Sequence, residues 1–426
     1  MYIWIKLVEM ESIVTSRPAL EFILAPRTSA EFFQRHFEKL PLHVERNDPA
    51  YFADVYSVTD VEDSLVVGAR EPENFALVKA GAPEIAADDF TYERPSLRWR
   101  LTGKGPRRWV DARKVVSYFA DGYTLIIKDA ALFSARLQRF CNHLQRDLMA
   151  FAQPNVYFTP PAAQGFEVHH DTHDTLTAQI AGEKTWRVYE PIIQLPLESQ
   201  PFHSGTKVEG LKQLDEVRLR AGDTLYIPRG FPHEAKTSET MSLHCTFALA
   251  PVRVTDVLDL ALRIAGDQDV ELRHALPPAV LAREDLATRL GEFFESRLTQ
   301  TFETPRMQVA VDIALNELFR LTRPNANGAF EQALHTFDIK PTTRVRIDET
   351  IPYVVRARGD GIELLIAGKV VAFPPICKPA FERLQRGPAT AAEMDPALSA
   401  AHRDLLIKLL TLEGLLIIDG YSSPSK

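Results

Sequence analysis

Cysteine is scarce in this sequence of 426 residues, which contains only Cys141, Cys245 and Cys377. Three widely spaced cysteines cannot form a disulfide framework, and they contain no CxxC pair of the kind that binds structural zinc. A small secreted fold held together by disulfide bonds is therefore excluded. Free thiols are typical of proteins in a reducing compartment.

Long hydrophobic runs are also missing from the sequence. No stretch approaches the roughly 20 uninterrupted apolar residues that a membrane-spanning helix needs. The opening segment, residues 1–14, is apolar but carries Lys6, Glu9 and Glu11, and it has no small-residue cleavage pattern. We therefore expect a cytoplasmic protein with neither a membrane span nor a secretory leader.

Positive charge is in short supply, because 49 Lys and Arg residues face 57 Asp and Glu residues, for a net charge of −8. Proteins that bind nucleic acid attract its phosphates through an excess of basic residues. The C-terminal segment 399–414 has few basic residues as well. We therefore expect no nucleic-acid partner.

The residues that are present predict a globular protein of several domains. Hydrophobic residues make up 45% of the chain, and a single core stops growing at roughly 250–300 residues. Short helices, a strand at 122–130 and a helix at 132–150 come first. From Asn155 to Pro251 the chain is a series of short β-type runs separated by Gly, Pro and Asp, the pattern of a barrel or jelly roll. We expect one domain over residues 1–252.

Two further domains are expected after the β-rich region. Residues 253–338 contain three amphipathic helices, which predict a small bundle or a segment that pairs with a second copy of the chain. Residues 339–426 mix strands and helices, with a hairpin signal at Gly359-Asp360-Gly361. Their order predicts a winged-helix-like domain.

A candidate metal site follows from His169, Asp171 and His233. If residues 168–171 form a strand, His169 and Asp171 lie on one face, because side chains alternate with a period of two. Two imidazoles and one carboxylate form the facial triad of non-heme iron(II) enzymes. His233 would supply the second imidazole from a later strand, after a turn rich in Gly and Pro. These three residues are the expected metal ligands and the centre of catalysis.

The neighbouring histidines are not expected to be ligands. His170 would point to the opposite face of the strand, and His173 would line the pocket mouth or pair with Asp174. A histidine by itself is more often a hydrogen-bonded core or surface residue than a ligand. The prediction therefore depends on the combined pattern, and a metal-free cupin is the alternative.

Three longer motifs resemble a known family: NVYFTPPAAQGFEVHHDTHD, QIAGEKTWRVYEP and LRAGDTLYIPRGFPHEA. Together with FFQRHFEKLPLHVER near the start, they resemble the JmjC/cupin-type ribosomal oxygenases, which hydroxylate arginine or histidine in ribosomal proteins. The resemblance implies a mixed α and β protein with a double-stranded β-helix core, a helical dimerisation segment and a C-terminal winged helix. It also implies iron(II), 2-oxoglutarate and dioxygen as reactants, and a homodimer.

The same resemblance assigns roles to residues around the metal. Lys184 stands where the family has a Lys or Arg that binds the distal carboxylate of 2-oxoglutarate, and a buried carboxylate needs such a cation. Asn155 and Tyr157 match positions that face the substrate, and they share one face of a strand. Ala248 differs from the serine that helps to hold the substrate in the histidine hydroxylases, so the target residue stays open. A surface lysine and core polar residues are the alternatives for these positions.

The function predicted from the sequence is hydroxylation of an amino-acid side chain of a protein, with a ribosomal protein as the expected partner. Three alternatives stay open, because a fold does not fix a substrate. The first is hydroxylation of a small molecule or a biosynthetic peptide. The second is a non-catalytic cupin and winged-helix binding protein. The third is demethylation, which follows when an N-methyl carbon is hydroxylated.

Asp174, Thr177 and His244 are candidates for orienting the metal ligands.

Overall fold

The computed structural model describes residues 18–94, 107–202, 210–276, 278–281, 283–322, 328–348 and 350–419. The opening segment 1–14, in which no secretory leader is expected, lies outside these residues. The chain divides into two compact units, residues 1–250 and 251–426. Within the part of the chain that is described, no helix is both long and apolar enough to cross a membrane.

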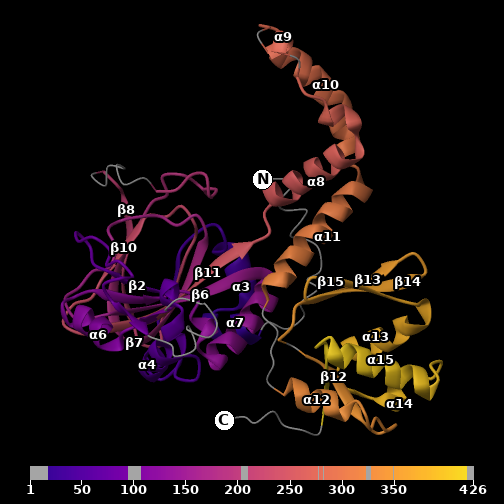
Figure 1. Cartoon of the computed structure of the whole chain (residues 1–426), viewed down its shortest axis with the longest axis horizontal. Helices are drawn as coiled ribbons and strands as arrows, with labels where there is room; N and C mark the ends of the chain where they lie inside the picture. The colour runs from indigo at the N-terminus through magenta and orange to yellow at the C-terminus, as the bar shows by residue number, and fades with distance from the viewer. Residues whose placement is uncertain are drawn as a thin grey trace. The chain divides into compact units, whose positions relative to one another are not determined.

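The first unit is built on a nine-stranded sheet (Figure 1). Its main path runs in the order β1-β9-β7-β11-β6-β5-β2, and β8 and β10 both pair with β7. Seven of its pairings are antiparallel: β1–β9, β7–β8, β7–β9, β7–β10, β7–β11, β2–β5 and β5–β6. The strands are β1 (Leu42–Val44), β2 (Phe75–Val78), β5 (Thr124–Ile127), β6 (Ala150–Thr159), β7 (Asp174–Tyr189), β8 (Gln213–Arg220), β9 (Thr224–Ile227), β10 (His233–Lys236) and β11 (Ser242–Pro251), with a separate ribbon of β3 (Thr91–Arg94) and β4 (Arg107–Val110).

Helices cover the sheet and bury its apolar face. The predicted helix at 132–150 is confirmed as α7, which begins after Ser134, whose hydroxyl accepts from the Leu137 amide. Leu20 and Ile23 of α2 pack in the same core as Leu144 of α7 and are fully buried. The helices of this unit are α2 (Pro18–Leu24), α3 (Ser29–Arg35), α4 (Val58–Val67), α6 (Ala112–Ala120) and α7 (Ala135–Leu148).

Strand β7 connects two parts of the β-structure, and the sequence pattern had divided it in two. Its first half pairs with β9 and β11, and its second half pairs with β8 and β10. Gly182 lies between the halves with φ +63, and a Cβ atom there would stand 1.8 Å from the Met241 carbonyl oxygen. Glycine is therefore required at this point. The strand gives the expected JmjC/cupin-like sheet, with a pocket between its two halves and β6 and β11.

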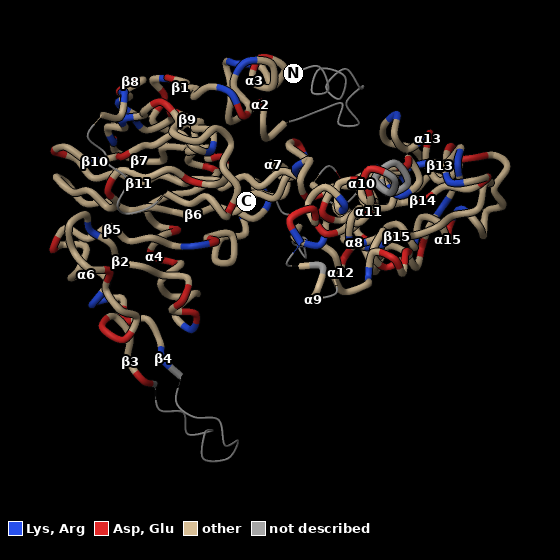
Figure 2. The backbone as a smooth tube through the Cα atoms, turned by 90° about the horizontal axis from the view of Figure 1, so that it is seen from above, with Lys and Arg blue, Asp and Glu red and all other residues tan. Residues whose placement is uncertain are grey.

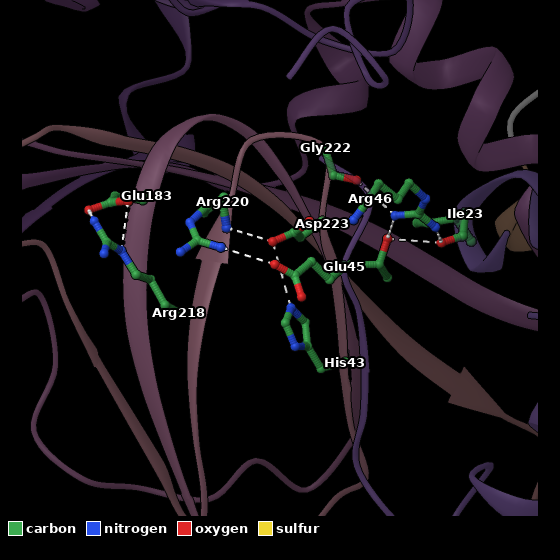
Figure 3. Close-up of polar contacts among 10 residues, drawn as sticks. Ile23, His43, Glu45, Arg46, Glu183, Arg218, Arg220, Gly222 and Asp223 are labelled. Carbon is green, nitrogen blue, oxygen red and sulfur yellow. Dashed lines mark hydrogen bonds and ion pairs between the residues drawn. The ribbon is translucent and has the colours of Figure 1, made fainter. Parts of the chain in front are cut away.

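Asp223 ties the edge strand β1 to the start of β9 (Figure 3). Its two carboxylate oxygens accept from the backbone amides of Arg46 and Arg220, each at 2.9 Å. The Arg46 guanidinium also donates to the carbonyl oxygens of Gly222 at 2.8 Å and Ile23 at 2.6 Å. This buried carboxylate explains the Gly-Asp pair of the third motif, because it fixes the turn from which β9 begins.

The second unit begins with helices and ends in two small sheets. Helices α8 and α11 pack through Leu260, Ala261, Ala310 and Ala314, and the small side chains of the three alanines allow close approach. Gly359 and Asp360 form the predicted two-residue hairpin, since Arg358 pairs with Gly361. The helices are α8 (Val254–Gln268), α9 (Pro278–Leu281), α10 (Leu286–Thr301), α11 (Thr304–Leu321), α12 (Ala329–His335), α13 (Lys378–Gln385), α14 (Ala391–Met394) and α15 (Ala400–Leu412). The sheets are β16-β12-β17 and β13-β14-β15, made of β12 (Arg344–Ile347), β13 (Tyr353–Arg358), β14 (Gly361–Ile366), β15 (Lys369–Phe373), β16 (Ala389–Thr390) and β17 (Leu416–Ile418).

Candidate metal centre and its pocket

His169, Asp171 and His233 converge at one end of the pocket. One ligand atom from each residue lies within 4.8 Å of the other two. The His233 Nε2 atom is 3.7 Å from an oxygen of Asp171, and the rings of His169 and His233 are 4.7 Å apart. His233 is buried and the other two are half-buried. The sequence prediction grouped these three residues, and the fold brings them together.

The expected strand over 168–171 is wrong. Residues 165–173 contain no strand, and His169 instead forms an isolated bridge with His233. The two residues exchange backbone hydrogen bonds, from the His169 amide at 3.1 Å and from the His233 amide at 2.8 Å. A paired bridge holds the two ligand-bearing segments together without a regular ladder, because it needs only one residue on each side.

A glycine turn brings His233 to this bridge. The Gly230 amide donates to the Asp171 carbonyl oxygen at 3.0 Å. Gly230 has φ +87, and a Cβ atom at this position would lie 2.3 Å from the Ile193 carbonyl oxygen. The Gly/Pro turn that was predicted to deliver His233 thus has a steric requirement for glycine.

Backbone carbonyl groups orient both imidazoles. The Nδ1 atom of His169 is 2.8 Å from the Glu167 carbonyl oxygen, and that of His233 is 3.0 Å from the Phe231 carbonyl oxygen. With Nδ1 donating to a carbonyl, each ring presents Nε2 with its lone pair toward Asp171. The suggestion that Asp174, Thr177 or His244 orients the ligands is therefore wrong for the two imidazoles.

The charge states also suit a divalent cation. Burial, with His169 nearby, lowers the pKa of His233 to about 4, so this ring is neutral at pH 7. Burial opposes the charge of Asp171, but the surrounding histidines, with His233 first, keep the pKa of this carboxyl below its ordinary value. Neutral imidazoles and an ionised carboxylate are the forms that bind metal, and nitrogen and oxygen donors without thiolate fit iron(II).

The pocket beside these residues has a volume of about 280 Å³. Its walls combine aromatic side chains with hydroxyl, amide and cationic groups. Asp171 is the one acidic residue among those that line it. The lining residues are Asn155, Tyr157, Phe166, His169, Asp171, His173, Thr175, Thr177, Lys184, Trp186, His233, Ala235, His244 and Thr246.

Lys184 is buried in this pocket, with 5% of its surface exposed. Its ammonium group donates to the Thr159 hydroxyl at 3.1 Å, and Thr159 also accepts from the Thr124 hydroxyl at 3.1 Å. Burial lowers the pKa of Lys184 to about 7. An ordinary surface lysine is thus excluded, and the ammonium has no carboxylate partner among the described residues.

Asn155 and Tyr157 both line the pocket from β6, as their shared face predicts. The Asn155 side-chain oxygen accepts from the Asp129 amide at 3.0 Å, which fixes this amide group. The Tyr157 ring stacks on His244, with ring centroids 4.9 Å apart. Desolvation raises the pKa of Tyr157 to a value above its ordinary range, so the phenol stays neutral.

Sequence reasoning missed several pocket residues that strand alternation could have found. Thr159 lies two residues after Tyr157, and Trp186 lies two residues after Lys184, so each shares a face with a predicted residue.

The predictions for the two histidines beside the ligands are confirmed in part. His173 lines the pocket, whereas His170 is buried elsewhere, next to the Gln200 carbonyl oxygen and the Phe202 ring.

Asp174 does not pair with His173 but anchors the turn that precedes His233. Its carboxylate accepts from the Arg229 amide at 2.9 Å and from the Tyr226 hydroxyl at 3.0 Å. The Arg229 guanidinium forms an ion pair with Glu38 at 2.8 Å. This network joins the segment after Asp171, the turn before His233 and the N-terminal part of the unit.

We expect Arg229→Ala to destabilise the first unit by roughly 3–5 kcal/mol, because it leaves Glu38 without its partner in a buried site. The side chains of this pair are only 8% and 12% exposed. Tryptophan fluorescence during urea unfolding reports on this unit, since all four tryptophans precede residue 251. The matched control is Arg218→Ala, which should cause a much smaller loss, because Arg218 is 57% exposed in its pair with Glu183 and solvent screens that pair. Equal losses of stability in both variants would contradict the conclusion that the buried Arg229–Glu38 pair stabilises this unit more than the exposed pair does.

Comparisons with known proteins identify the domain. The sequence model described as "JmjC domain" matches residues 129–257. Ribosomal oxygenase 1 of Gallus gallus is 32% identical over 267 residues, which is 60% of this chain and 41% of the relative. Ribosomal oxygenase 1 of Homo sapiens is 32% identical over 317 residues, which is 71% of this chain and 46% of the relative. The chain therefore spans less than half the length of these relatives.

A third relative and the solved structures are also oxygenases or hydroxylases by name. The bifunctional lysine-specific demethylase and histidyl-hydroxylase NO66 of Drosophila mojavensis is 28% identical over 331 residues, covering 72% of this chain and 34% of the relative. The Escherichia coli protein YcfD, described as a ribosomal oxygenase, has the same fold, with a TM-score of 0.53, 16% identity and coverage of 92% of this chain and 98% of YcfD. YcfD with cobalt and 2-oxoglutarate gives a TM-score of 0.52 at 16% identity and the same coverage. The resemblance drawn from the motifs is confirmed: residues 129–257 match the JmjC domain model, and the chain is similar to the ribosomal oxygenases.

Proposed function

We propose that this protein is an iron(II)- and 2-oxoglutarate-dependent oxygenase that hydroxylates an amino-acid side chain of a protein. One observation carries the proposal: two imidazoles and a carboxylate face one another in a pocket that also contains a buried lysine with no carboxylate partner among the described residues. The three ligands fit iron(II), and the lysine fits the far carboxylate of 2-oxoglutarate.

His169, Asp171 and His233 would hold the metal on one side and leave its remaining positions for the reactants. When bound, iron(II) would supply the activation of dioxygen, in which 2-oxoglutarate is oxidised to succinate and carbon dioxide while a substrate C–H bond becomes C–OH. The carbonyl groups of Glu167 and Phe231 keep the two imidazoles oriented throughout.

The other pocket residues position the reactants. Lys184 would bind the distal carboxylate, with Thr159 holding the ammonium group in place. Asn155 and Tyr157 would contact the substrate side chain. The Asp129 amide fixes the orientation of Asn155, and the His244 ring fixes that of Tyr157. The rings of Phe166 and Trp186 lie beside the metal ligands and exclude water from this end of the pocket.

A protein substrate is favoured over a small molecule by a groove that adjoins the pocket. This groove has a volume of about 590 Å³ and shares Phe166 and His169 with the pocket. Its walls are the loop 78–84 and the segment 165–168. A groove that reaches the proposed metal ligand His169 suits a reacting side chain with polypeptide on both sides. The names of the relatives favour a ribosomal protein as the source of that polypeptide.

The direct test incubates the purified protein with iron(II), 2-oxoglutarate and a ribosomal protein fraction. Hydroxylation adds about 16 Da, the mass of one oxygen atom, to one ribosomal protein. A mass increase on a small molecule alone would favour the alternative substrate class. Loss of about 14 Da from a methylated protein would indicate demethylation, because a hydroxylated N-methyl group leaves as formaldehyde.

For the C-terminal part, residues 339–426, we propose a winged-helix-like domain that does not bind nucleic acid. Its longest helix, α15, exposes Leu405, Leu409 and Leu412 rather than a row of basic side chains. Figure 2 shows Lys and Arg intermixed with Asp and Glu along both units, with no continuous basic stripe over the described residues. Such a surface lacks the positive field that attracts phosphates.

The three thiols support the proposed reducing, cytoplasmic compartment. Cys141, Cys245 and Cys377 are all buried, and none of them forms a disulfide among the described residues. A buried thiol that has no partner cysteine behaves as a small apolar residue and is stable where disulfides do not form.

We propose a homodimer through the helical segment 253–338. Phe294 of α10 is 43% exposed and Val309 of α11 is 45% exposed, and Figure 1 shows α10 extending beyond the α8–α11 pair. Leu318 and Phe319 are buried within the unit and do not belong to the contact. Exposed aromatic and aliphatic side chains on such an arm support an isologous pairing.

Phe294→Glu is expected to convert the dimer to a monomer in light scattering, since a carboxylate in the buried centre of an interface is costly. Leu409→Glu is the matched control, because Leu409 is 45% exposed on α15, outside the segment 253–338. Wild-type protein that scatters as a monomer at micromolar concentration would contradict the dimer.

A further inference from the structure

His244 occupies the centre of the pocket wall without a role in holding the metal. It lies on β11, is 2% exposed and lines the pocket together with Thr246, two residues further along the same strand. The pairing of β11 with β7 shifts register between Leu243 and His244. Such irregularities re-aim a side chain, and this one lies beside the pocket.

The two ring nitrogens of His244 have no hydrogen-bond partner among the described residues, and Nδ1 is buried. The ring is held only by aromatic contacts, stacked on Tyr157 at 4.9 Å and edge-on to Trp186 at 5.5 Å. A buried polar atom that lacks a partner is unfavourable, so its persistence in a pocket points to a partner that a ligand brings.

Lys184 lies near enough to His244 to act on it electrostatically. Burial first, and then the charge of Lys184, lower the pKa of His244 well below its ordinary value. The His244 ring is therefore neutral and has one N–H group to donate. The donors of the pocket thus include a buried ammonium and a buried imidazole, and its one acidic side chain is the metal ligand Asp171.

We propose that His244 is a second binding residue for 2-oxoglutarate, and that it donates an N–H to the same carboxylate that Lys184 binds. The proposal rests on the proposed function, because it assumes that 2-oxoglutarate enters this pocket. A carboxylate has two oxygens and accepts from several donors at once, so Lys184 and His244 can bind it together. The aromatic neighbours of His244 then fix the ring for this contact.

The test measures 2-oxoglutarate binding to the manganese-loaded full-length protein by isothermal titration calorimetry without oxygen. His244→Phe keeps an aromatic ring against Tyr157 but removes the N–H group. It should raise the Kd for 2-oxoglutarate by roughly 10- to 100-fold, the value of a hydrogen bond to a charged group. Manganese stoichiometry should stay at the wild-type value. His402→Phe, at an exposed histidine of α15, is the matched control and should bind normally.

His244→Gln provides a second variant, which keeps a donor but loses the ring, and it should bind more tightly than His244→Phe. An unchanged Kd in His244→Phe, with Lys184→Ala strongly weakened, would overturn the inference and leave the proposed function intact. Equal weakening in both His244 variants would assign the ring a packing role only and would also overturn it. Wild-type protein that does not bind 2-oxoglutarate at all would overturn the proposed function as well.

Discussion

His233→Ala is expected to abolish 2-oxoglutarate turnover and iron(II) binding while leaving the fold largely intact. The imidazole is one of three groups whose ligand atoms lie within 4.8 Å of one another, so its loss leaves only two protein ligands. The backbone bridge between residues 169 and 233 does not depend on either side chain and should survive. His169→Ala should have the same effect. Iron content and carbon dioxide release from labelled 2-oxoglutarate measure the two losses.

The sharpest control for this result is His170→Asn. His170 is adjacent to a proposed ligand in the sequence, but its ring lies beside the Gln200 carbonyl oxygen and outside the pocket. Any account based only on a histidine-rich segment predicts that both changes are harmful. The geometry predicts that the His170 variant retains iron and turnover. Full activity in His169→Ala or His233→Ala would refute the ligand assignment.

Lys184→Ala is expected to raise the KM for 2-oxoglutarate by a large factor. Removal of one partner from a buried charge pair costs roughly 3–5 kcal/mol, which corresponds to at least about a hundredfold in affinity. Lys184→Arg should be milder, because it keeps the cation but must fit a longer planar group beside Thr159. Initial rates over a range of 2-oxoglutarate concentrations give the KM.

Lys236→Ala serves as the control for charge alone, because Lys236 is exposed on β10 in the same unit. Its KM should match that of the wild type. An unchanged KM in Lys184→Ala would show that another cation binds the cosubstrate. The two variants should differ clearly, because no other Lys or Arg lines the pocket among the described residues.

The sequence predicted which residues lie together at the site better than it predicted the local structure that carries them. His169, Asp171, His233 and Lys184 were grouped correctly in space, because ligand type and motif context do not require knowledge of the backbone path. The strand over 168–171 was wrong, since alternation describes ladders and this segment contains a single bridge. The grouping survived the error because the bridge between His169 and His233 still brings the two ligand-bearing segments together.

The partners of the ligands could not be predicted from residue types. The groups that orient His169 and His233 are carbonyl oxygens of Glu167 and Phe231, and every residue has a carbonyl oxygen. The continuous strand β7 was likewise hidden, because Gly182 resembles a turn in the sequence. Its positive φ is accommodated inside the strand, where only the approach of the Met241 carbonyl explains the glycine.

The account as a whole is tested most directly by intact-mass analysis of ribosomal proteins from cells that lack the gene. One protein should be about 16 Da lighter than in the parent, the mass of one oxygen atom. Complementation with the wild-type gene should restore the mass, and complementation with His233→Ala should not. Identical masses for every ribosomal protein in the two strains would contradict a ribosomal substrate, and wild-type protein that never consumes 2-oxoglutarate would contradict the oxygenase itself.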